Sequence, residues 1–328
     1  HRTANAMLEE INQFRFFWEG VEFRIGVSIG LIEINESTIN YTELFRYADA
    51  ACYMAKELGR NRIHVHKAEH TDLASRHGEM QWVPRITEAL EQNRFILYAQ
   101  SIEALGEQTG SHCEVLLRMV DERGCIIPPS AFLPAAERYG LIRGIDNWVV
   151  ETALTLMASH PEFLKQVHLV SINVSGPSVD SVDFLDSVAD KITKLGIDAN
   201  KICFEITETA AISNLNAARV FISKLRLLGC RFALDDFGSG LSSFRYLKNL
   251  PVDYLKIDGM FVKGMVDDRI DYAMVKSINE IGHVMDMKTI AEFVETDEIK
   301  NKLIEIGVDY VQGYRIGKPE PFNELLKR

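Results

Sequence analysis

From residue 82 onward, short apolar runs alternate with longer segments in which apolar residues recur every three or four positions. Short apolar runs are typical of buried strands, and the longer segments, such as 217–225, are typical of helices with one buried face. Because this alternation continues to residue 328, it predicts an α/β fold of the TIM-like (β/α)8 barrel type. The expected strands lie near 95–100, 113–119, 167–174, 201–206, 231–236, 254–258, 287–292 and 309–313.

An open, doubly wound sheet is the competing architecture for such a pattern. Sheets of that kind that bind dinucleotides carry a glycine-rich phosphate fingerprint after the first strand. No such fingerprint follows residues 95–100. The barrel is therefore the favoured prediction.

Polar side chains stand at or near the ends of these expected strands, with Lys256 as a cation among them. A barrel sets the carboxyl ends of its parallel strands in a ring, so the side chains there can converge on one point. Carboxylate and amide oxygens are the ligands of hard divalent cations, which in turn serve phosphate chemistry. The acidic and amide residues in question are Glu114, Asn173, Glu205, Asp235, Asp236, Asp258, Glu292, Glu295 and Gln312.

The composition excludes several classes of protein. A formal net charge of −11 disfavours a general nucleic-acid binder, although metal ions can still recruit a small phosphorylated ligand. The sequence contains no run of about 18 apolar residues, so it predicts no membrane span. The five cysteines lack metal-ligand spacing and are expected to be reduced, core or near-core residues of a cytoplasmic protein. The chain begins at His1 without a signal-peptide pattern, so we expect a fragment of a longer protein.

A smaller unit precedes the barrel. Residues 23–31 have the pattern of a strand, a helix is expected from about residue 42 to 58, and residues 62–66 resume as a strand. Residues 68–81 have no strong apolar period and are predicted to be a linker. The predicted domains are therefore 1–67 and 82–328.

The second domain resembles the EAL-domain cyclic di-GMP phosphodiesterases. Eight blocks carry the resemblance in the family's order, from Glu-Val-Leu-Leu-Arg at 114–118, with valine in place of alanine, to Gln-Gly-Tyr at 312–314. The blocks between them are Phe-Leu-Pro-Ala-Ala-Glu (132–137), Ile-Asn-Val-Ser (172–175), Phe-Glu-Ile-Thr-Glu (204–208), Asp-Asp-Phe-Gly-Ser-Gly (235–240), Leu-Lys-Ile-Asp (255–258) and Ala-Glu-Phe-Val-Glu-Thr (291–296).

The resemblance implies an enzyme that hydrolyses cyclic di-GMP to linear pGpG with two Mg²⁺ or Mn²⁺ ions. It implies that Glu114, Asn173, Glu205 and Asp235 bind the first cation. Asp235 would be shared with the second cation, and Asp236 and Glu292 would complete the ligand set. The alternative is a degenerate module that binds cyclic di-GMP without cleaving it. Such receptors typically lose metal ligands or the lysine, and this chain retains them.

The resemblance also implies roles around the metal ions. Lys256 would contact the attacking water, with Glu292 and Glu295 as further catalytic residues. Asp258 would be catalytic by holding Lys256, because residues two apart on a strand point to one face. Glu208 would anchor a mobile loop at 237–243. The substrate-binding positions implied are Gln100, Leu116, Arg118, Glu137, Gln312 and Tyr314.

The first unit resembles the C-terminal half of a GGDEF diguanylate cyclase domain, an α/β fold, through residues 48–56 and 59–62. The signature loop is absent from the chain, so no cyclase activity is expected. The resemblance further implies a homodimer through the EAL domain and no contact with DNA, RNA or the membrane by this segment. The parent protein is expected to be cytoplasmic here, with an upstream region that could anchor it in the inner membrane.

Two positions depart from the family pattern. Phe293 stands where the family usually has glycine, next to the expected ligand Glu292. The phenyl ring must find room behind the site, or it shifts the end of the strand. Ser101 replaces a common proline after Gln100, which is a small loss of rigidity.

Overall fold

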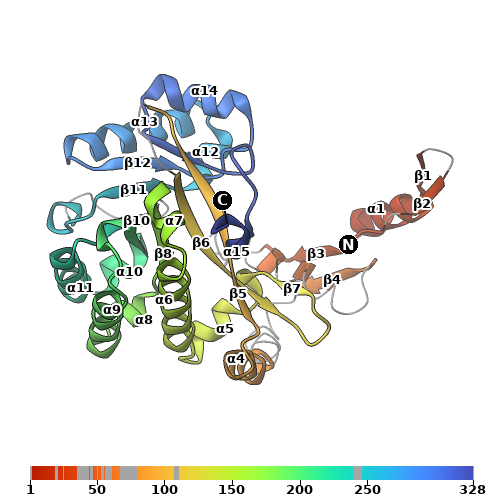
Figure 1. The fold of residues 1–328 in the computed structure, drawn as a ribbon. Coiled ribbons are helices and arrows are strands. Elements are labelled where there is room, and N and C mark those ends of the chain that lie inside the picture. Colours follow the sequence, from red (N-terminus) through yellow and green to blue (C-terminus); the bar gives the residue numbers. More distant parts are fainter. Residues whose placement is uncertain are drawn as a thin grey trace. The chain divides into compact units, whose positions relative to one another are not determined.

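The computed structural model describes residues 2–18, 21–24, 26–34, 44, 47–49, 51–52, 55, 61–66, 80–106, 111–238 and 246–327. The chain divides into two units, His1–Gln81 and Trp82–Arg328, and each is described by itself (Figure 1). The second unit begins at the residue where the sequence places the second domain. Most of the predicted linker at 68–81 lies outside the described residues.

A closed ring of eight strands forms the centre of the second unit, which confirms the predicted barrel. The order around the ring is β5, β13, β12, β11, β10, β9, β8 and β6, and β6 pairs with β5 to close it. Two short strands, β7 (Ile126–Ile127) and β14 (Glu320–Pro321), extend it. The ring strands are β5 (Phe95–Ala104), β6 (Ser111–Val120), β8 (Val167–Asn173), β9 (Ile202–Thr207), β10 (Arg231–Phe237), β11 (Tyr254–Ile257), β12 (Lys288–Ala291) and β13 (Tyr310–Gln312).

One strand differs from the expected parallel ring. β5 runs antiparallel to both of its ring neighbours, β6 and β13, whereas the strands from β6 to β13 pair in parallel. Only residues 105–110 connect β5 to β6. A parallel crossover needs a dozen or more residues, usually with a helix, so this connection permits only an antiparallel pair.

An apolar layer fills the barrel interior, with one side chain from each ring strand. The ring of His112 on β6 lies 5.7 Å from the ring of Tyr310 and 5.9 Å from that of Tyr254, between centroids. Burial, together with His168 and Lys256, lowers the pKa of His112 to about 3, so this side chain packs as a neutral ring. The other members of the layer are Ile102, Leu169, Cys203, Ala233, Tyr254, Ile290 and Tyr310.

Amphipathic helices surround the strands, as Figure 1 shows. In α11 (Leu215–Leu228), the side chain of Asn214 caps the first turn, and Gly229 ends the helix with a φ of 110°. Its buried Phe221 packs edge-on against Phe204 and Phe232 of two strands. The other helices are α4 (Trp82–Glu91), α5 (Leu133–Arg138), α6 (Ile142–Ala158), α7 (Pro161–Gln166), α8 (Gly176–Val179), α9 (Val182–Leu195), α10 (Glu208–Ser213), α12 (Gly259–Gly264), α13 (Arg269–Val284), α14 (Asp297–Ile306) and α15 (Phe322–Leu325).

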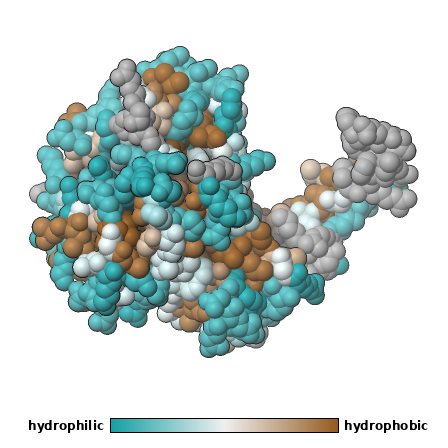
Figure 2. All heavy atoms as spheres, viewed as in Figure 1, coloured by the Kyte–Doolittle hydropathy of each residue, from teal (hydrophilic) through white to brown (hydrophobic). Residues whose placement is uncertain are grey.

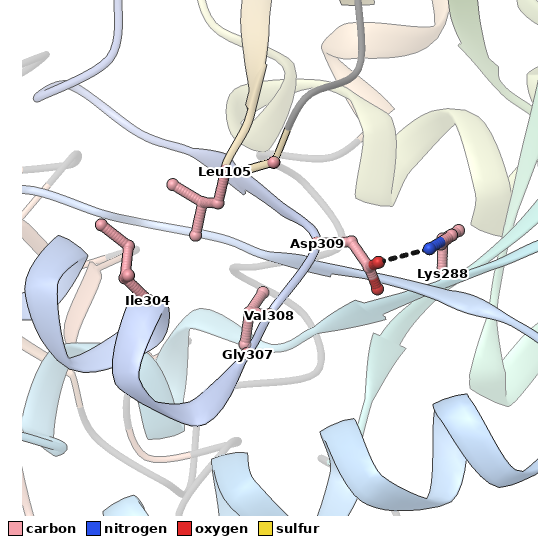
Figure 3. Close-up of a pocket in the computed structure, with 7 residues that line it drawn as sticks. Leu105, Lys288, Ile304, Gly307, Val308 and Asp309 are labelled. Atoms are coloured by element: carbon pink, nitrogen blue, oxygen red, sulfur yellow. Dashed lines mark hydrogen bonds and ion pairs between the residues drawn. The ribbon is translucent and has the colours of Figure 1, made fainter.

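A pocket of about 360 Å³ opens at the end of the barrel where the parallel strands begin. Figure 3 shows Lys288 and Asp309 paired in its wall beside apolar side chains. Asp309 accepts hydrogen bonds from Lys288 Nζ at 2.7 Å, from His283 Nε2 at 2.8 Å and from the backbone N–H of Thr289 at 2.9 Å. Burial raises the pKa of Asp309, but these donors outweigh it and hold the pKa below its usual range. These three hydrogen bonds to Asp309, which directly precedes β13, therefore tie β13 to α13 and to β12.

Asp309→Asn is expected to destabilise the barrel by about 1–3 kcal/mol at pH 7, because it removes a charged acceptor from three donors. A depressed folded-state pKa stabilises above the unfolded-state pKa of about 3.9, and this contribution disappears as pH falls through the folded value. The stability gap between wild type and variant should therefore narrow as pH falls from 6 toward 3. Urea unfolding across this range measures the gap, and a constant gap would contradict the assignment.

The first unit contains α1 (Arg2–Gln13), the antiparallel pair β1 (Arg15–Trp18) and β2 (Val21–Arg24), and the parallel pair β3 (Ile29–Ile32) and β4 (Ile63–His66). The single strand predicted over 23–31 is wrong, because β2 ends before β3 begins. Residues 47–49 are helical, and a Cβ added at Gly30 would lie 2.4 Å from the carbonyl oxygen of Ala48. Glycine therefore permits close approach of helix and strand here. The rest of the expected helix lies largely outside the described residues.

Hydrophilic residues occupy much of the face shown in Figure 2, with smaller apolar areas between them. Among the described helices, none is long and apolar enough to cross a membrane. All five cysteines are free, and Cys113, Cys203 and Cys230 are buried. Cys125 is exposed, so the expectation that every cysteine is a core or near-core residue is wrong there.

Candidate metal centre

The polar site residues form the next layer of the barrel, toward the carboxyl ends of the parallel strands. Inward-facing side chains recur every second residue along a strand. Glu114 thus stands two residues after His112, and Lys256 two after Tyr254. On the antiparallel β5, Gln100 stands two residues before Ile102. The remaining members are Ser171, Glu205, Asp235, Glu292 and Gln312. Asn173 lies two residues beyond Ser171 on β8.

Lys256 lies in the middle of this polar layer, with no solvent exposure. Its Nζ is 2.6 Å from Glu205 Oε2 and 2.9 Å from Glu292 Oε1. It is also 3.1 Å from Asp235 Oδ1 and 3.4 Å from Glu114 Oε2. Burial lowers the pKa of Lys256, but these four carboxylates outweigh it and raise the pKa well above its usual value. The lysine therefore carries its positive charge.

One lysine does not neutralise four buried carboxylates. Burial raises the pKa of Glu205 to about 8, against the opposing charge of Lys256 and with repulsion from Glu114 and Asp235. Burial likewise raises the pKa of Asp235 and, more strongly, that of Glu292. Such a cluster is stabilised by protons or by additional cations.

The residues present fit divalent cations. Glu205 Oε1 and Gln312 Oε1 are buried and have no hydrogen-bond partner among the described residues. Asp235, Asp236 and Glu292 each offer a carboxylate oxygen within 4.8 Å of the others. Hard cations such as Mg²⁺ and Mn²⁺ take oxygen ligands of this kind.

The end of β10 is shaped so that two consecutive aspartates reach one region. The register with β11 shifts between Leu234 and Phe237, and Asp236 has a φ of 54°. A bulge or irregularity of this kind redirects side chains that a regular strand would send to opposite faces. Burial and the Asp235 charge raise the pKa of Asp236 to about 6. Backbone strain is thus concentrated at a candidate ligand pair.

Amide side chains hold Glu114 from both sides. Asn173 Nδ2 donates to Glu114 Oε1 at 2.6 Å, and Gln312 Nε2 donates to Glu114 Oε2 at 2.7 Å. Gln312 also donates to Gln100 Oε1 at 3.3 Å, and Gln100 donates to the carbonyl oxygen of Gly317. Burial raises the pKa of Glu114, but Lys256 and the two amide donors outweigh it and lower the pKa. Glu114 is therefore held as a carboxylate.

The residues 84–319 match the family described as the EAL domain. The chain belongs to the EAL domain family. Its EAL domain is similar to two solved structures. One is the PaMucR phosphodiesterase in complex with c-di-GMP, at 31% identity and a TM-score of 0.69, over 75% of this chain and 99% of that one. The other is the FimX EAL domain from Pseudomonas aeruginosa bound to c-di-GMP, at 30% and 0.68, over 73% and 96%.

Curated relatives of the chain are longer proteins. The cyclic di-GMP phosphodiesterase PdeB of Shewanella oneidensis is 42% identical over 300 residues, which are 91% of this chain and 35% of PdeB. The cyclic di-GMP phosphodiesterase PdeF of Escherichia coli is 36% identical over 327 residues, 98% of this chain and 43% of PdeF. The chain thus spans less than half the length of either relative.

Within the EAL domain, Glu208 contacts both flanks of the segment after β10. Its Oε2 accepts from the backbone N–H of Gly238 at 3.0 Å, and its Oε1 accepts from the hydroxyl of Tyr246 at 2.6 Å. Residues 239–245, which contain most of the predicted mobile loop, lie outside the described residues. The sequence gives no signal for Tyr246, because a lone tyrosine in a mixed polar and apolar segment has no distinctive pattern.

Two predicted catalytic residues, Asp258 and Glu295, do not contact Lys256 in the structure. Asp258 does not pair with Lys256. Its Oδ1 accepts from the backbone N–H of Met260 at 2.8 Å and caps α12, because the strand ends before it. Glu295 is exposed, in the segment after β12, and it is not among the carboxylates that surround Lys256.

The predicted substrate-binding residues lie around the same end of the EAL domain. Arg118 and Leu116 are partly buried on β6, and Arg118 Cζ lies 5.4 Å from the centroid of the Tyr98 ring. Tyr314 follows β13 and is 62% exposed, with Lys318 Nζ near its ring. Glu137 is on α5, and partial burial together with Asp146 raises its pKa. The structure brings Gln100 and Gln312 into the polar layer, whereas these four lie outside it.

Phe293 finds room outside the metal centre. Its ring packs on Gly259, where an added Cβ would lie 2.1 Å from Phe293 Cδ2, and Lys263 Nζ sits 4.0 Å from the ring centroid. Glu292 keeps its 2.9 Å ion pair with Lys256. The cost is in the backbone, because Phe293 has a φ of 53°, in the left-handed region that glycine adopts readily.

We expect Phe293→Gly to be more stable than Phe293→Ala by about 1 kcal/mol, because both lose the ring but only alanine keeps the left-handed strain. Elsewhere in a folded chain, alanine is normally the more stable of the two. Urea unfolding of both variants measures the difference. Position 158, the last residue of α6, serves as the control. There the wild-type alanine should be more stable than Ala158→Gly.

Proposed function

We propose that this EAL domain is a divalent-metal-dependent phosphodiesterase that hydrolyses cyclic di-GMP to linear pGpG. The observation that carries the proposal is the complete polar layer, with charged Lys256 held among Glu114, Glu205, Asp235 and Glu292. The names of the curated relatives and the c-di-GMP complexes of the similar structures support the same substrate.

Two sets of side chains would hold the cations, with Asp235 common to both. When bound, Mg²⁺ or Mn²⁺ would supply a nucleophilic hydroxide near neutral pH and neutralise charge on the phosphoryl oxygens. Orphaned Glu205 Oε1 and the grouped carboxylates of the second set support this assignment. The first set is Glu114, Asn173, Glu205 and Asp235, and the second is Asp235, Asp236 and Glu292.

The chain's own residues then orient and stabilise the reacting groups. A water molecule loses one proton as its oxygen forms a bond to phosphorus, the bond from phosphorus to the 3′ oxygen breaks, and the 3′ oxygen takes up a proton. Lys256 remains protonated, so its Nζ can donate to the attacking oxygen and stabilise the negative charge on the oxygens around phosphorus. Arg118, at the rim, would bind a phosphate of the substrate. Gln100 and Gln312 keep Glu114 in place.

Product analysis tests this function directly. The protein is incubated with cyclic di-GMP and Mg²⁺ or Mn²⁺, and pGpG is measured by chromatography. We expect turnover with either metal and none in excess EDTA, with recovery when the metal is restored. Tight binding of cyclic di-GMP without turnover in both metals would instead identify a receptor. The retained lysine and carboxylates favour the enzyme over that alternative.

Two further proposals come from the resemblance. The EAL domain would form a homodimer, which light scattering after size-exclusion chromatography measures. The first unit would be the C-terminal half of a GGDEF domain without cyclase activity. Incubation with GTP and Mg²⁺ should therefore yield no cyclic di-GMP.

A further inference from the structure

A buried carboxylate outside the polar layer grips the chain just after β8. Asp146, on α6, is 6% exposed. A single oxygen of it, Oδ2, accepts two hydrogen bonds from Ser175: one from the backbone N–H at 3.1 Å and one from the hydroxyl at 2.5 Å. Burial raises the pKa of Asp146 against these hydrogen bonds and one from the side chain of Ser178 on α8. Burying a carboxylate is unfavourable unless hydrogen bonds compensate it, and the Ser175 donors provide that compensation here.

The hydrogen bonds from Ser175 to Asp146 do not cap the helix that follows. Ser175 precedes α8, but its side chain makes no capping hydrogen bond to that helix. A serine at this position could cap the helix by itself. Here its hydroxyl is directed to Asp146 instead. The contact therefore fixes the backbone at Ser175 rather than starting α8.

The fixed backbone leads directly to a candidate metal ligand. Asn173 is two residues earlier, and between them the backbone N–H of Val174 donates to the carbonyl oxygen of Glu205 at 2.9 Å. The segment 173–175 is thus tied to β9 on one side and to α6 on the other. The amide nitrogen of Asn173 donates a hydrogen bond to Glu114 at 2.6 Å, which leaves the amide oxygen of Asn173 for a cation.

We infer that Asp146 is a positioning residue: by holding Ser175, it sets the direction in which Asn173 presents its amide oxygen to a divalent cation. The inference rests on the metal centre of the proposed function. Groups that orient metal ligands typically change metal affinity 10- to 100-fold when they are removed.

Direct binding of Mn²⁺, followed by electron paramagnetic resonance of the free ion, tests the inference without substrate. Asp146→Ala removes both hydrogen bonds from Ser175, so we expect it to bind Mn²⁺ about 10- to 100-fold more weakly than wild type. Asp146→Asn is the matched variant. Because Oδ2 alone accepts both bonds, one amide oxygen can replace it, and Mn²⁺ affinity should stay within about 3-fold of wild type.

Activity gives a second readout. The Mn²⁺ concentration for half-maximal hydrolysis should rise in Asp146→Ala by the same factor, and kcat at saturating Mn²⁺ should return to near the wild-type value. A residue with a purely structural role would lower kcat at every Mn²⁺ concentration, and Asp146→Asn would not rescue metal affinity selectively.

The outcomes separate this inference from the proposed function. A folded Asp146→Ala with wild-type Mn²⁺ affinity overturns the inference. If that variant does not fold, Ser175→Ala, which loses only the hydroxyl contact, should weaken Mn²⁺ binding several-fold, and unchanged affinity there overturns the inference too. Mn²⁺ binding by the wild type without hydrolysis of cyclic di-GMP overturns the proposed function alone. Absence of Mn²⁺ binding by the wild type overturns both.

Discussion

Lys256→Met is expected to lower kcat for cyclic di-GMP hydrolysis by about 100- to 1,000-fold, the cost of losing one charge-stabilising donor in a closed site. Methionine is apolar and of similar length, so the variant removes the charge with little change in packing. The four carboxylates that contact Lys256 then lose their internal cation. Rates at saturating substrate and saturating Mn²⁺ measure the effect on the chemical step.

Stability should respond to the same change in a metal-dependent way. Breaking a buried ion pair leaves uncompensated charge, which typically destabilises by about 3–5 kcal/mol. Added Mn²⁺ should recover part of this loss in Lys256→Met, because a cation binds only the folded cluster. Lys263→Met, on the surface of α12, is the control and should leave kcat nearly unchanged. A kcat within 3-fold of wild type in Lys256→Met would exclude a catalytic role for the lysine.

Asp235→Asn should remove the proposed shared ligand of two cations. An amide offers one neutral oxygen, so it cannot bridge as a carboxylate does. We expect Mn²⁺ stoichiometry to fall from two ions to one or none, and kcat to fall by about 1,000-fold or more, because two-metal catalysis needs both ions. Binding titrations with Mn²⁺ and product analysis measure the two effects.

The matched change at Asp267 separates this effect from general loss of acidity. Asp267 is an exposed aspartate between α12 and α13. Asp267→Asn should keep two bound Mn²⁺ ions and the wild-type rate. Two tightly bound ions in Asp235→Asn would mean that another group bridges them.

The barrel could be predicted from sequence because burial alone sets its pattern. Short apolar runs between amphipathic helices marked all eight ring strands to within a few residues. The direction of β5 could not be read in this way, because an apolar run has the same composition in either direction. The short connection at 105–110 was the available signal, and its length, with Gly106 and Gly110, indicates a hairpin.

Most of the polar layer was also predictable, since a side chain two residues beyond a buried one on the same strand faces the same way. In the structure, Glu114, Glu205 and Lys256 follow this rule, two residues after His112, Cys203 and Tyr254. It failed for Asp258, because the strand ends at Ile257 and the next residue belongs to a helix cap. From the sequence alone, an aspartate that caps a helix cannot be distinguished from an aspartate that serves as a ligand at the end of a strand.

Contacts between distant helices and loops were beyond the sequence pattern. Asp146 lies on a helix whose periodicity predicts only which face is buried, and its partner Ser175 is on another element. Tyr246 hydrogen-bonds to Glu208, but their separation in the sequence matches neither the helix period nor the strand period. Such pairs depend on the three-dimensional crossing of elements, which local propensity does not determine.

The pairing of β5 with β13 has a consequence for how the chain folds during its synthesis. β5 is the first ring strand along the chain, and it hydrogen-bonds to β13, which is the last. Gln312 and Glu114, which meet beside this seam, are separated by 198 positions in the sequence. Contacts of such high separation form slowly, because a long loop must close before they contribute. A chain still emerging from the ribosome can therefore already contain Glu114 and Glu205, but the proposed metal centre stays incomplete until β13 brings Gln312 beside Glu114.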